Sequence, residues 1–416
     1  MSLQSRVFSD LERQNGIIVG FWRFANSLGS SKYELKISLM NKEIYITDYN
    51  CVTPLGFDVD SNWKALLEGK SGVALHKVID NHEAFFVSKI DSEKLDIEFK
   101  KNFDNQNFPR LEKMFLLSLK PLVERNTISD ETAFILSTTK GNISLLKNET
   151  TLPEGVYLSH LAQKLADFFG FKTKPIVVSN ACVSGVMAIS VAKNMIQAGK
   201  YKDAFVVAGD EISEFVISGF NSFQAIGSEP CKPYDKNRNG INLGEATATV
   251  YMTSEINQNE KFRFKVLGDS AINDANHISG PSRTGDGLFA SVQNAMKESK
   301  VSSEQIDFIS AHGTATLYND EMEAIAFNRM DLQNVPLNSM KSYYGHCLGA
   351  SGLLESIISM ESALKNTLIQ SKNFKEMGVS QDLNIIKENQ SAEIKYILKT
   401  ASGFGGCNAA IVLEKA

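Results

Sequence analysis

Cysteine and long apolar stretches are scarce in this chain of 416 residues. The five cysteines are an odd number, and none belongs to the C-x-x-C pair that is typical of zinc sites. The longest apolar stretches, such as residues 16–22, are far shorter than the roughly 20 residues that span a bilayer. The sequence therefore predicts no disulfide framework, no metal site and no membrane span, and it favours a reducing, cytoplasmic compartment.

Positive charge is not in excess either, because the formal net charge is −5. Broad nucleic-acid binding needs a concentrated positive surface, so we expect no nucleic-acid partner. Pro-rich or Ser-rich linkers that would separate independent domains are also missing. With 43% hydrophobic and 22% charged residues, the chain has the composition of a globular protein that buries one large core or two medium ones.

From Met40 onward, strand patterns alternate with helix patterns, which predicts an α/β architecture. Apolar or alternating strand patterns occupy 41–50, 132–137, the start at 176, 204–210, 262–268, 308–311, 395–398 and 409–413. Helical patterns occupy 61–68, 157–169, the stretch that follows Cys182 up to 198, 287–297, 319–329 and 352–364. Residues 1–39 have no steady periodicity, and we expect an N-terminal extension or an added leader outside the fold.

Cys182 lies where a short β-branched run ends and a helical pattern begins. A helix N-terminus carries partial positive charge and free N–H groups, which favour a thiolate and leave donors for a carbonyl oxygen. The same position also suits a small buried residue, since cysteine is common in apolar turns. This segment alone leaves both interpretations open.

Three further segments combine glycine with polar residues. His312 and His346 each lie in a small, glycine-rich turn before a helical pattern, and glycine lets a ligand approach the backbone closely. Residues 402–408 form another glycine-rich turn before the last strand pattern, for which a tight hairpin is the alternative interpretation.

Taken in order, these segments resemble the β-ketoacyl-acyl carrier protein synthases of the thiolase superfamily, in the elongating class with a Cys-His-His triad. The motifs are the cysteine turn, H-G-T-x-T-x-x-N-D-x-x-E from His312, K-S-x-x-G-H-x-x-G-A-x-G from Lys341, and G-F-G-G-x-N from Gly403. The resemblance covers the chain from about residue 40 to its end. It implies a thiolase-like, five-layered αβαβα fold of two similar halves, 40–254 with the nucleophilic cysteine and 255–416 with two catalytic histidines.

The resemblance also implies the activity, which is decarboxylative Claisen condensation of malonyl-acyl carrier protein with an acyl group held on Cys182. The N–H groups of Cys182 and Phe404 would form the oxyanion hole, and Phe404 would gate the acyl chain. His312 and His346 would donate hydrogen bonds to the malonyl thioester oxygen. Lys341 would keep His346 suitably oriented.

Other positions carry supporting roles by the same resemblance. Glu323 matches a structural acid, and Thr314 and Thr316 match positions that hydrogen-bond phosphopantetheine, with both hydroxyls on one side of an extended segment. The substrates carry phosphopantetheine on acyl carrier protein, and no cofactor is expected on the enzyme itself. Arg110 and Lys113 are candidates for docking the acidic carrier, with a solvated helix face as the alternative.

Related families offer alternatives. Biosynthetic thiolases use a second cysteine near the C-terminus, which invites comparison with Cys407, but the second histidine motif is of synthase type. Initiating synthases have asparagine where His346 stands, and a chain-length-factor-like partner subunit lacks the active cysteine. Thr400-Ala-Ser replaces the Asn-Ser-Phe of fatty-acid enzymes. We therefore expect fatty-acid or polyketide elongation, with an aryl polyene or flexirubin-type product as the hypothesis, by a homodimer or a heterodimer with a related subunit.

Overall fold

The computed structural model describes residues 42–79, 84–104, 107–146, 151–256, 262–274 and 280–416, so the segment 1–39 lies outside the described residues. The framework is a ten-stranded sheet. Five strands come from the first part of the chain, in the spatial order β1 (Tyr45–Val52), β8 (Ala246–Thr253), β6 (Asp203–Asp210), β4 (Thr132–Ser137) and β5 (Ile176–Val178). Five come from the second part, in the order β9 (Phe264–Asn273), β15 (Cys407–Lys415), β14 (Tyr396–Gly403), β10 (Phe308–Ser310) and β11 (Leu337–Asn338).

These two sets of strands repeat one topology. In each set the first strand of the chain lies antiparallel beside the last. The last strand is in turn the antiparallel neighbour of a group of three parallel strands. The sets meet where Tyr45 and Ile46 of β1 pair with Lys265 and Phe264 of β9. The prediction of an α/β fold with two similar halves is therefore confirmed.

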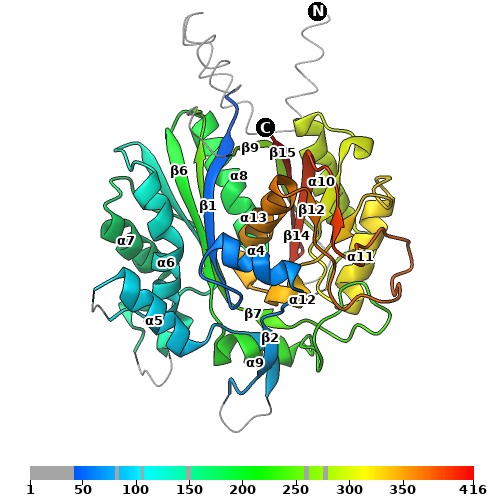
Figure 1. Cartoon of the computed structure of the whole chain (residues 1–416), viewed down its shortest axis with the longest axis horizontal. Coiled ribbons are helices and arrows are strands. Elements are labelled where there is room, and N and C mark those ends of the chain that lie inside the picture. The colour runs from blue at the N-terminus through cyan, green and yellow to red at the C-terminus, as the bar shows by residue number, and fades with distance from the viewer. Residues whose placement is uncertain (1–41, 80–83, 105–106, 147–150, 257–261, 275–279) are drawn as a thin grey trace, which may run out of the picture.

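Helices separate and cover the two half-sheets, as Figure 1 shows. Two central helices lie between the half-sheets and contact both of them, α8 (Ser184–Gln197) and α13 (Ser351–Leu364). The outer face of the first half-sheet is covered by α6 (Arg110–Arg125) and α7 (Leu158–Phe169), and that of the second by α10 (Asp286–Ser299) and α11 (Leu317–Asn328). The layers thus follow the order αβαβα.

The central helices approach each other unusually closely because both carry glycine at their crossing. A Cβ atom on Gly185 of α8 would lie 2.7 Å from the backbone nitrogen of Leu353 and 2.8 Å from the carbonyl oxygen of Gly349. A Cβ atom on Gly352 would lie 2.8 Å from the backbone nitrogen of Val186. The N-terminal turns of α8 and α13 therefore pack backbone against backbone, which brings together the loops that precede them.

Smaller elements complete the described part of the chain. They are α4 (Val59–Leu67), α5 (Ser92–Asn102), α9 (Glu214–Ser222), α12 (Lys341–Tyr344), β2 (Val73–His76), β3 (Phe85–Ser88), β7 (Leu243–Gly244), β12 (Thr367–Leu368) and β13 (Gln390–Ser391), with four short 3-10 turns at Ile143–Leu146, Glu154–Val156, Ser303–Gln305 and Leu348–Ala350. Within the described ranges, no helix is both long enough and apolar enough to cross a bilayer.

Candidate active site

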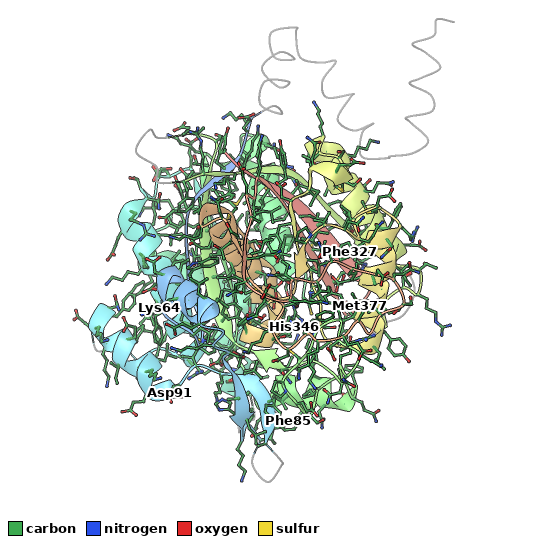
Figure 2. The ribbon with its side chains drawn as sticks, turned by 45° about the vertical axis from the view of Figure 1, so that its right-hand side comes forward. Lys64, Phe85, Asp91, Phe327, His346 and Met377 are labelled. Atoms are coloured by element: carbon green, nitrogen blue, oxygen red, sulfur yellow. The ribbon has the colours of Figure 1, made fainter. Side chains whose placement is uncertain are left out.

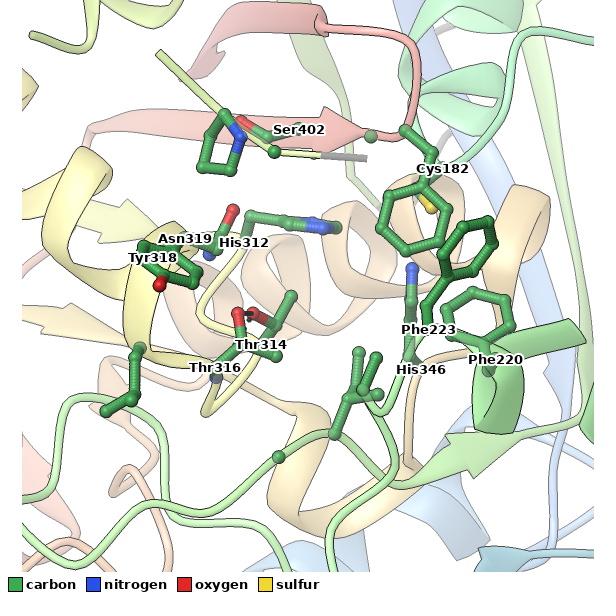
Figure 3. Close-up of a pocket in the computed structure, with 18 of the residues that line it drawn as sticks. Cys182, Phe220, Phe223, His312, Thr314, Thr316, Tyr318, Asn319, His346 and Ser402 are labelled. Atoms are coloured by element: carbon green, nitrogen blue, oxygen red, sulfur yellow. Dashed lines mark hydrogen bonds between the residues drawn. The ribbon is translucent and has the colours of Figure 1, made fainter. Parts of the chain in front are cut away.

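A cavity of about 520 Å³ lies where the loops before the central helices meet the loops after β10 and β14. Its lining includes six of the residues predicted from the sequence: Cys182, His312, Thr314, Thr316, His346 and Phe404. In Figure 3 the rings of His312 and His346 both point toward Cys182, while Thr314 and Thr316 lie across the cavity from Phe220 and Phe223. The structure therefore gathers these segments of the sequence around one space.

Cys182 lies in a tight turn between β5 and α8. Ala181, directly before it, has a φ angle of 43°, which is the left-handed region that residues with a side chain seldom adopt. Ser184 holds the turn on both sides, because its Oγ accepts a hydrogen bond from the Asn180 nitrogen at 2.8 Å and donates to the Ala181 carbonyl at 2.6 Å. The turn holds the cysteine at the start of α8, where it is 6% exposed.

The resting thiol is protonated at neutral pH. Burial raises the pKa of Cys182 to about 12, and neighbouring Cys407 raises it as well, while the Lys341 charge and a hydrogen bond from the Phe404 N–H lower it. The thiolate that the sequence led us to expect at a helix start is therefore not favoured in the resting site, because desolvation outweighs these opposing contributions. The Cys182 thiol must therefore lose its proton during its attack on a substrate.

Phe404 is presented to the thiol by the hairpin between β14 and β15. The hairpin turns through Gly405 and Gly406, whose φ angles are 86° and 76°. A Cβ atom on Gly403 would lie 3.0 Å from the backbone nitrogen of Cys182, so glycine is needed for this approach. The Phe404 backbone N–H also binds the Cys182 sulfur, so the N–H groups of both residues lie close to it. Their role as an oxyanion hole stays a prediction.

Three phenylalanine rings form an aromatic wall beside the thiol. The ring of Phe404 stacks on Phe220 with centroids 5.2 Å apart, and the ring of Phe223 meets Phe404 edge-on at 5.4 Å. Phe220 belongs to α9 and Phe223 follows it directly, so one helix end supports the Phe404 loop. Phe404 was predicted from the sequence, but Phe220 and Phe223 were not. The local sequence of α9 does not show that these two rings will contact the distant Phe404 loop.

His312 follows β10, and its turn is held by Glu323 of α11. The two oxygens of Glu323 accept hydrogen bonds from the backbone nitrogens of His312 and Gly313, at 2.8 and 2.7 Å, and from the Tyr234 hydroxyl at 2.9 Å. Burial, followed by the neighbouring Asp320 carboxylate, raises the pKa of Glu323 to about 7. The Glu323 carboxylate thus holds the backbone of the His312 turn, which fits the structural role that the resemblance implied.

His346 is fixed by its backbone and by one side chain. Its nitrogen donates to the Asn242 carbonyl at 2.7 Å, its carbonyl accepts from the Gly244 nitrogen at 3.0 Å, and its ring Nδ1 lies 3.0 Å from Ser351 Oγ. Figure 2 shows the residue well inside the outline of the molecule, consistent with its 1% exposure. Ser351 was not predicted, because it occupies a variable position of the histidine motif.

The two imidazole rings stand at right angles with centroids 5.1 Å apart. His312 Nδ1 and His346 Nε2 are buried and find no hydrogen-bond partner among the described residues. An unpaired buried polar atom is costly, so both nitrogens gain from a ligand that can pair with them. Where the Ser351 hydroxyl donates to Nδ1 of His346, its Nε2 carries the hydrogen and donates into the cavity.

Both rings are uncharged at neutral pH. Burial lowers the pKa of His312 and of His346 well below the ordinary value, and the Lys341 charge is the next largest cause for both. The Lys399 charge also lowers both pKa values. The site therefore holds two neutral hydrogen-bonding rings rather than an imidazolium.

Lys341 acts on these rings through its charge and not by a hydrogen bond within the described part of the chain. Its Nζ binds Glu355 Oε1 at 2.7 Å, and Lys399 Nζ binds Glu355 Oε2 at 2.6 Å. The ring of His346 is oriented instead by Ser351, as described above. Glu355 and Lys399 were missed, because no local pattern links a glutamate of α13 to a lysine of β14.

The hydroxyls of Thr314 and Thr316 lie 2.8 Å apart and share one hydrogen bond. They meet at a turn and not on an extended segment, because Ala315 between them has a φ angle of 61°. Asp320 secures the turn by accepting from the Thr314 nitrogen at 2.9 Å. The two hydroxyls therefore form one polar spot on the cavity wall, by a different geometry from the one expected.

Arg110 and Lys113 lie outside the cavity lining, and both are paired internally. Arg110 forms an ion pair with the fully buried Glu245 and also donates to a backbone carbonyl, and Lys113 binds Asp96 at 2.6 Å. Each of the two side chains is 20% exposed. Their docking role stays a prediction, and this geometry favours a structural role for Arg110.

Cys407 lies beneath the Phe404 loop, with its sulfur 3.4 Å from the Phe404 carbonyl oxygen. It is buried and absent from the cavity lining, and burial raises the pKa of its thiol. Within the described ranges, no group of three or more His, Cys, Asp or Glu residues is placed to hold a metal ion.

Two models of one protein family together match more than half of the chain. The N-terminal domain of beta-ketoacyl synthases matches residues 127–256, and the C-terminal domain matches residues 264–375. Among curated relatives, a putative mitochondrial 3-oxoacyl-[acyl-carrier-protein] synthase of Schizosaccharomyces pombe is 26% identical over 427 residues, covering 90% of this chain and 99% of the relative. The 3-oxoacyl-[acyl-carrier-protein] synthase 2 of Coxiella burnetii is 26% identical with the same coverage.

Solved structures share the fold over most of its length. The ketosynthase ApeO in complex with its chain length factor ApeC, from Xenorhabdus doucetiae, superposes with a TM-score of 0.79 at 23% identity, covering 90% of this chain and 98% of that chain. A beta-ketoacyl synthase from Burkholderia phymatum superposes with a TM-score of 0.78 at 22% identity, covering 90% of this chain and all of that chain.

Proposed function

Since the chain belongs to the β-ketoacyl synthase family, we propose that its cavity carries out decarboxylative Claisen condensation. An acyl group on Cys182 joins a two-carbon unit from malonyl-acyl carrier protein, which gives β-ketoacyl-acyl carrier protein and carbon dioxide. One observation carries the assignment: the thiol of Cys182 and the residues His312 and His346, each with an unpaired ring nitrogen among the described residues, line one cavity. The thiol can hold the acyl group as a thioester, and the two imidazole rings can donate hydrogen bonds to the enolate oxygen.

The first half-reaction loads the acyl group. The sulfur of Cys182 attacks the thioester carbonyl of the acyl carrier, and the N–H groups of Cys182 and Phe404 stabilise the oxyanion that forms. The bond to the carrier sulfur then breaks. Because the resting thiol is protonated, its proton passes to the departing carrier sulfur, so the exchange of one thioester for another is balanced.

The second half-reaction forms the carbon–carbon bond. Loss of carbon dioxide from the malonyl group leaves its electron pair as an enolate, whose oxygen accepts hydrogen bonds from His312 and His346. The enolate carbon attacks the acyl carbonyl, and the bond to Cys182 breaks with the electron pair on sulfur. The thiolate takes up a proton from solvent, which restores the resting thiol.

We propose acyl carrier protein as the partner and no cofactor on the enzyme. A solved structure of the same fold, with a TM-score of 0.78 at 20% identity, contains an acyl carrier protein in complex with its ketosynthase, which supports this choice. We also propose a cytoplasmic homodimer, and the alternative is a heterodimer with a related subunit such as the chain length factor bound to ApeO. Light scattering of the purified chain measures its molar mass in solution. The mass of two chains would support the homodimer, and the mass of one chain would favour a heterodimer with a related subunit.

The direct experiment supplies the purified chain with malonyl-acyl carrier protein and a set of acyl carriers. Saturated C8 to C16 chains compete with aryl and polyene chains, and both β-ketoacyl product and released carbon dioxide are measured. We expect product and carbon dioxide in equal amounts, with aryl or polyene chains preferred. Folded protein that yields neither with any carrier would contradict the function, and preference for saturated chains would place the protein in fatty-acid elongation.

Removal of the two threonine hydroxyls tests the proposed phosphopantetheine contact. The double change Thr314→Val and Thr316→Val keeps the side-chain shape and removes the polar spot. We expect the KM for malonyl-acyl carrier protein to rise about tenfold, because one or two hydrogen bonds are lost, with a smaller change in kcat. Thr367→Val, on the remote strand β12, is the matched control, and an equal KM for the double variant and this control would exclude the contact.

A further inference from the structure

Behind the two histidines lies a cluster of three buried charges. Lys341 and Lys399 are fully buried and Glu355 is 3% exposed. The two ammonium groups bind different oxygens of the same carboxylate, at 2.7 and 2.6 Å. Two ammonium groups thus share one carboxylate in the interior, where an incompletely paired charge is costly. Burial accordingly lowers the pKa of Lys399, although the Glu355 charge raises it.

Lys399 also binds the strand that carries His312. Its Nζ donates to the carbonyl oxygens of Thr400 at 2.7 Å and Ser310 at 3.1 Å, and Ala311 follows at 3.5 Å. Ser310 and Ala311 directly precede His312 in the chain. Lys399 therefore fixes the end of β10 from which the His312 ring projects.

The other members of the cluster lead to His346. Glu355 lies on α13 one turn after Ser351, whose hydroxyl contacts the His346 ring. Lys341 opens α12, which ends two residues before His346. The cluster consequently joins the segments that carry the two rings.

We propose that Lys399 is a positioning residue for the condensation, which fixes the His312 turn against α13 and supplies a second buried positive charge beside both imidazole rings. The proposal rests on the function proposed above. It concerns how the two rings are held and which charge state they have before substrate binds.

The surroundings of the rings support this role. The charged groups that act on the rings are Lys341 and Lys399. Around them, Glu323 binds the His312 backbone, Asp320 binds the Thr314 backbone and Glu355 binds both lysines, while Cys182, Arg238 and Asp274 line the same cavity. Burial and the Lys341 charge lower the pKa of both histidines, and the Lys399 charge lowers it further. A lowered histidine pKa keeps the ring neutral until the pH falls below it, so loss of the Lys399 charge moves protonation to a higher pH.

The test measures the two titrations directly. Protein labelled with ¹⁵N in histidine is followed by NMR across pH 4 to 8, with the signals of His312 and His346 assigned from His→Gln variants. In Lys399→Met we expect the pKa of His312 and of His346 to rise, because the Lys399 charge lowers both. The acidic limb of condensation against pH should move in the same direction.

Two further variants separate the charge from the contacts. Lys399→Gln keeps a donor for the carbonyls and removes the charge, so it should shift both titrations as the methionine does while retaining more of kcat. Lys415→Met is the matched control, because this lysine also donates to a backbone carbonyl, that of Ala363 at 2.7 Å, but far from the rings. Its titrations should match those of the unchanged protein.

Unshifted titrations in folded Lys399→Met and Lys399→Gln would overturn the proposal. Failure of both variants to fold would overturn it as well, because Lys399 would then be a structural residue. The NMR titration needs no substrate. Inactivity of the unchanged protein would therefore count against the proposed function, while the titrations would still test the role of Lys399.

Discussion

Cys182→Ala is expected to lower the rate of condensation by about 10⁴-fold or more, which is the scale of effect seen when a covalent nucleophile is removed. Without the sulfur, no acyl enzyme forms, and the enolate has no bound acyl carbon to attack. Cys407 cannot replace it, because that thiol is buried beneath the Phe404 loop and does not line the cavity. The measurement is the initial rate of β-ketoacyl-acyl carrier protein formation.

The same variant should still release carbon dioxide from malonyl-acyl carrier protein, since both histidines remain. Cys51→Ala is the matched control, because Cys51 is a buried cysteine of β1 outside the cavity lining, and it should leave condensation near its normal rate. β-Ketoacyl product from Cys182→Ala at the rate of this control would refute Cys182 as the acyl carrier.

Loss of either histidine should separate the two half-reactions. His312→Ala and His346→Ala are each expected to slow decarboxylation by about 10²- to 10³-fold, as found when one preorganised donor to a developing oxyanion is removed. Loading of the acyl group onto Cys182 should change far less, because its oxyanion is held by backbone N–H groups. Release of labelled carbon dioxide and single-turnover loading measure the two steps.

His76→Ala serves as the control for these variants, since His76 of β2 lies outside the cavity lining. It should keep both steps at the normal rate. If the folded His312 and His346 variants instead lost loading and left decarboxylation intact, the assignment of the two rings to the enolate oxygen would be wrong.

Much of the site could be predicted from the sequence because its residues follow strands at one end of the fold. Cys182 follows β5, His312 follows β10, and Phe404 follows β14. Each lies in a short motif whose glycines are needed for close approach, as Gly403 shows beside Cys182. The two similar halves were implied by the family resemblance, while their common topology is visible in the order of the strands.

What the sequence could not predict depends on contacts between distant segments. Lys399 stands in a strand pattern, and only the fold shows that its ammonium group meets Glu355 of α13. Arg110 fits an exposed helix face by pattern, yet the structure pairs it with buried Glu245. The raised pKa of Cys182 has the same origin, because local sequence shows a helix start but not how deeply the loops around it exclude water.

The position of the acyl group on the protein tests the account most directly. The chain is incubated with an acyl-acyl carrier protein in the absence of malonyl carrier, digested at acidic pH, and examined by mass spectrometry. We predict one acyl thioester per chain, on the peptide that contains Cys182, and its disappearance when malonyl-acyl carrier protein is added. An adduct on the Cys407 peptide, or no adduct on folded protein, would contradict the account.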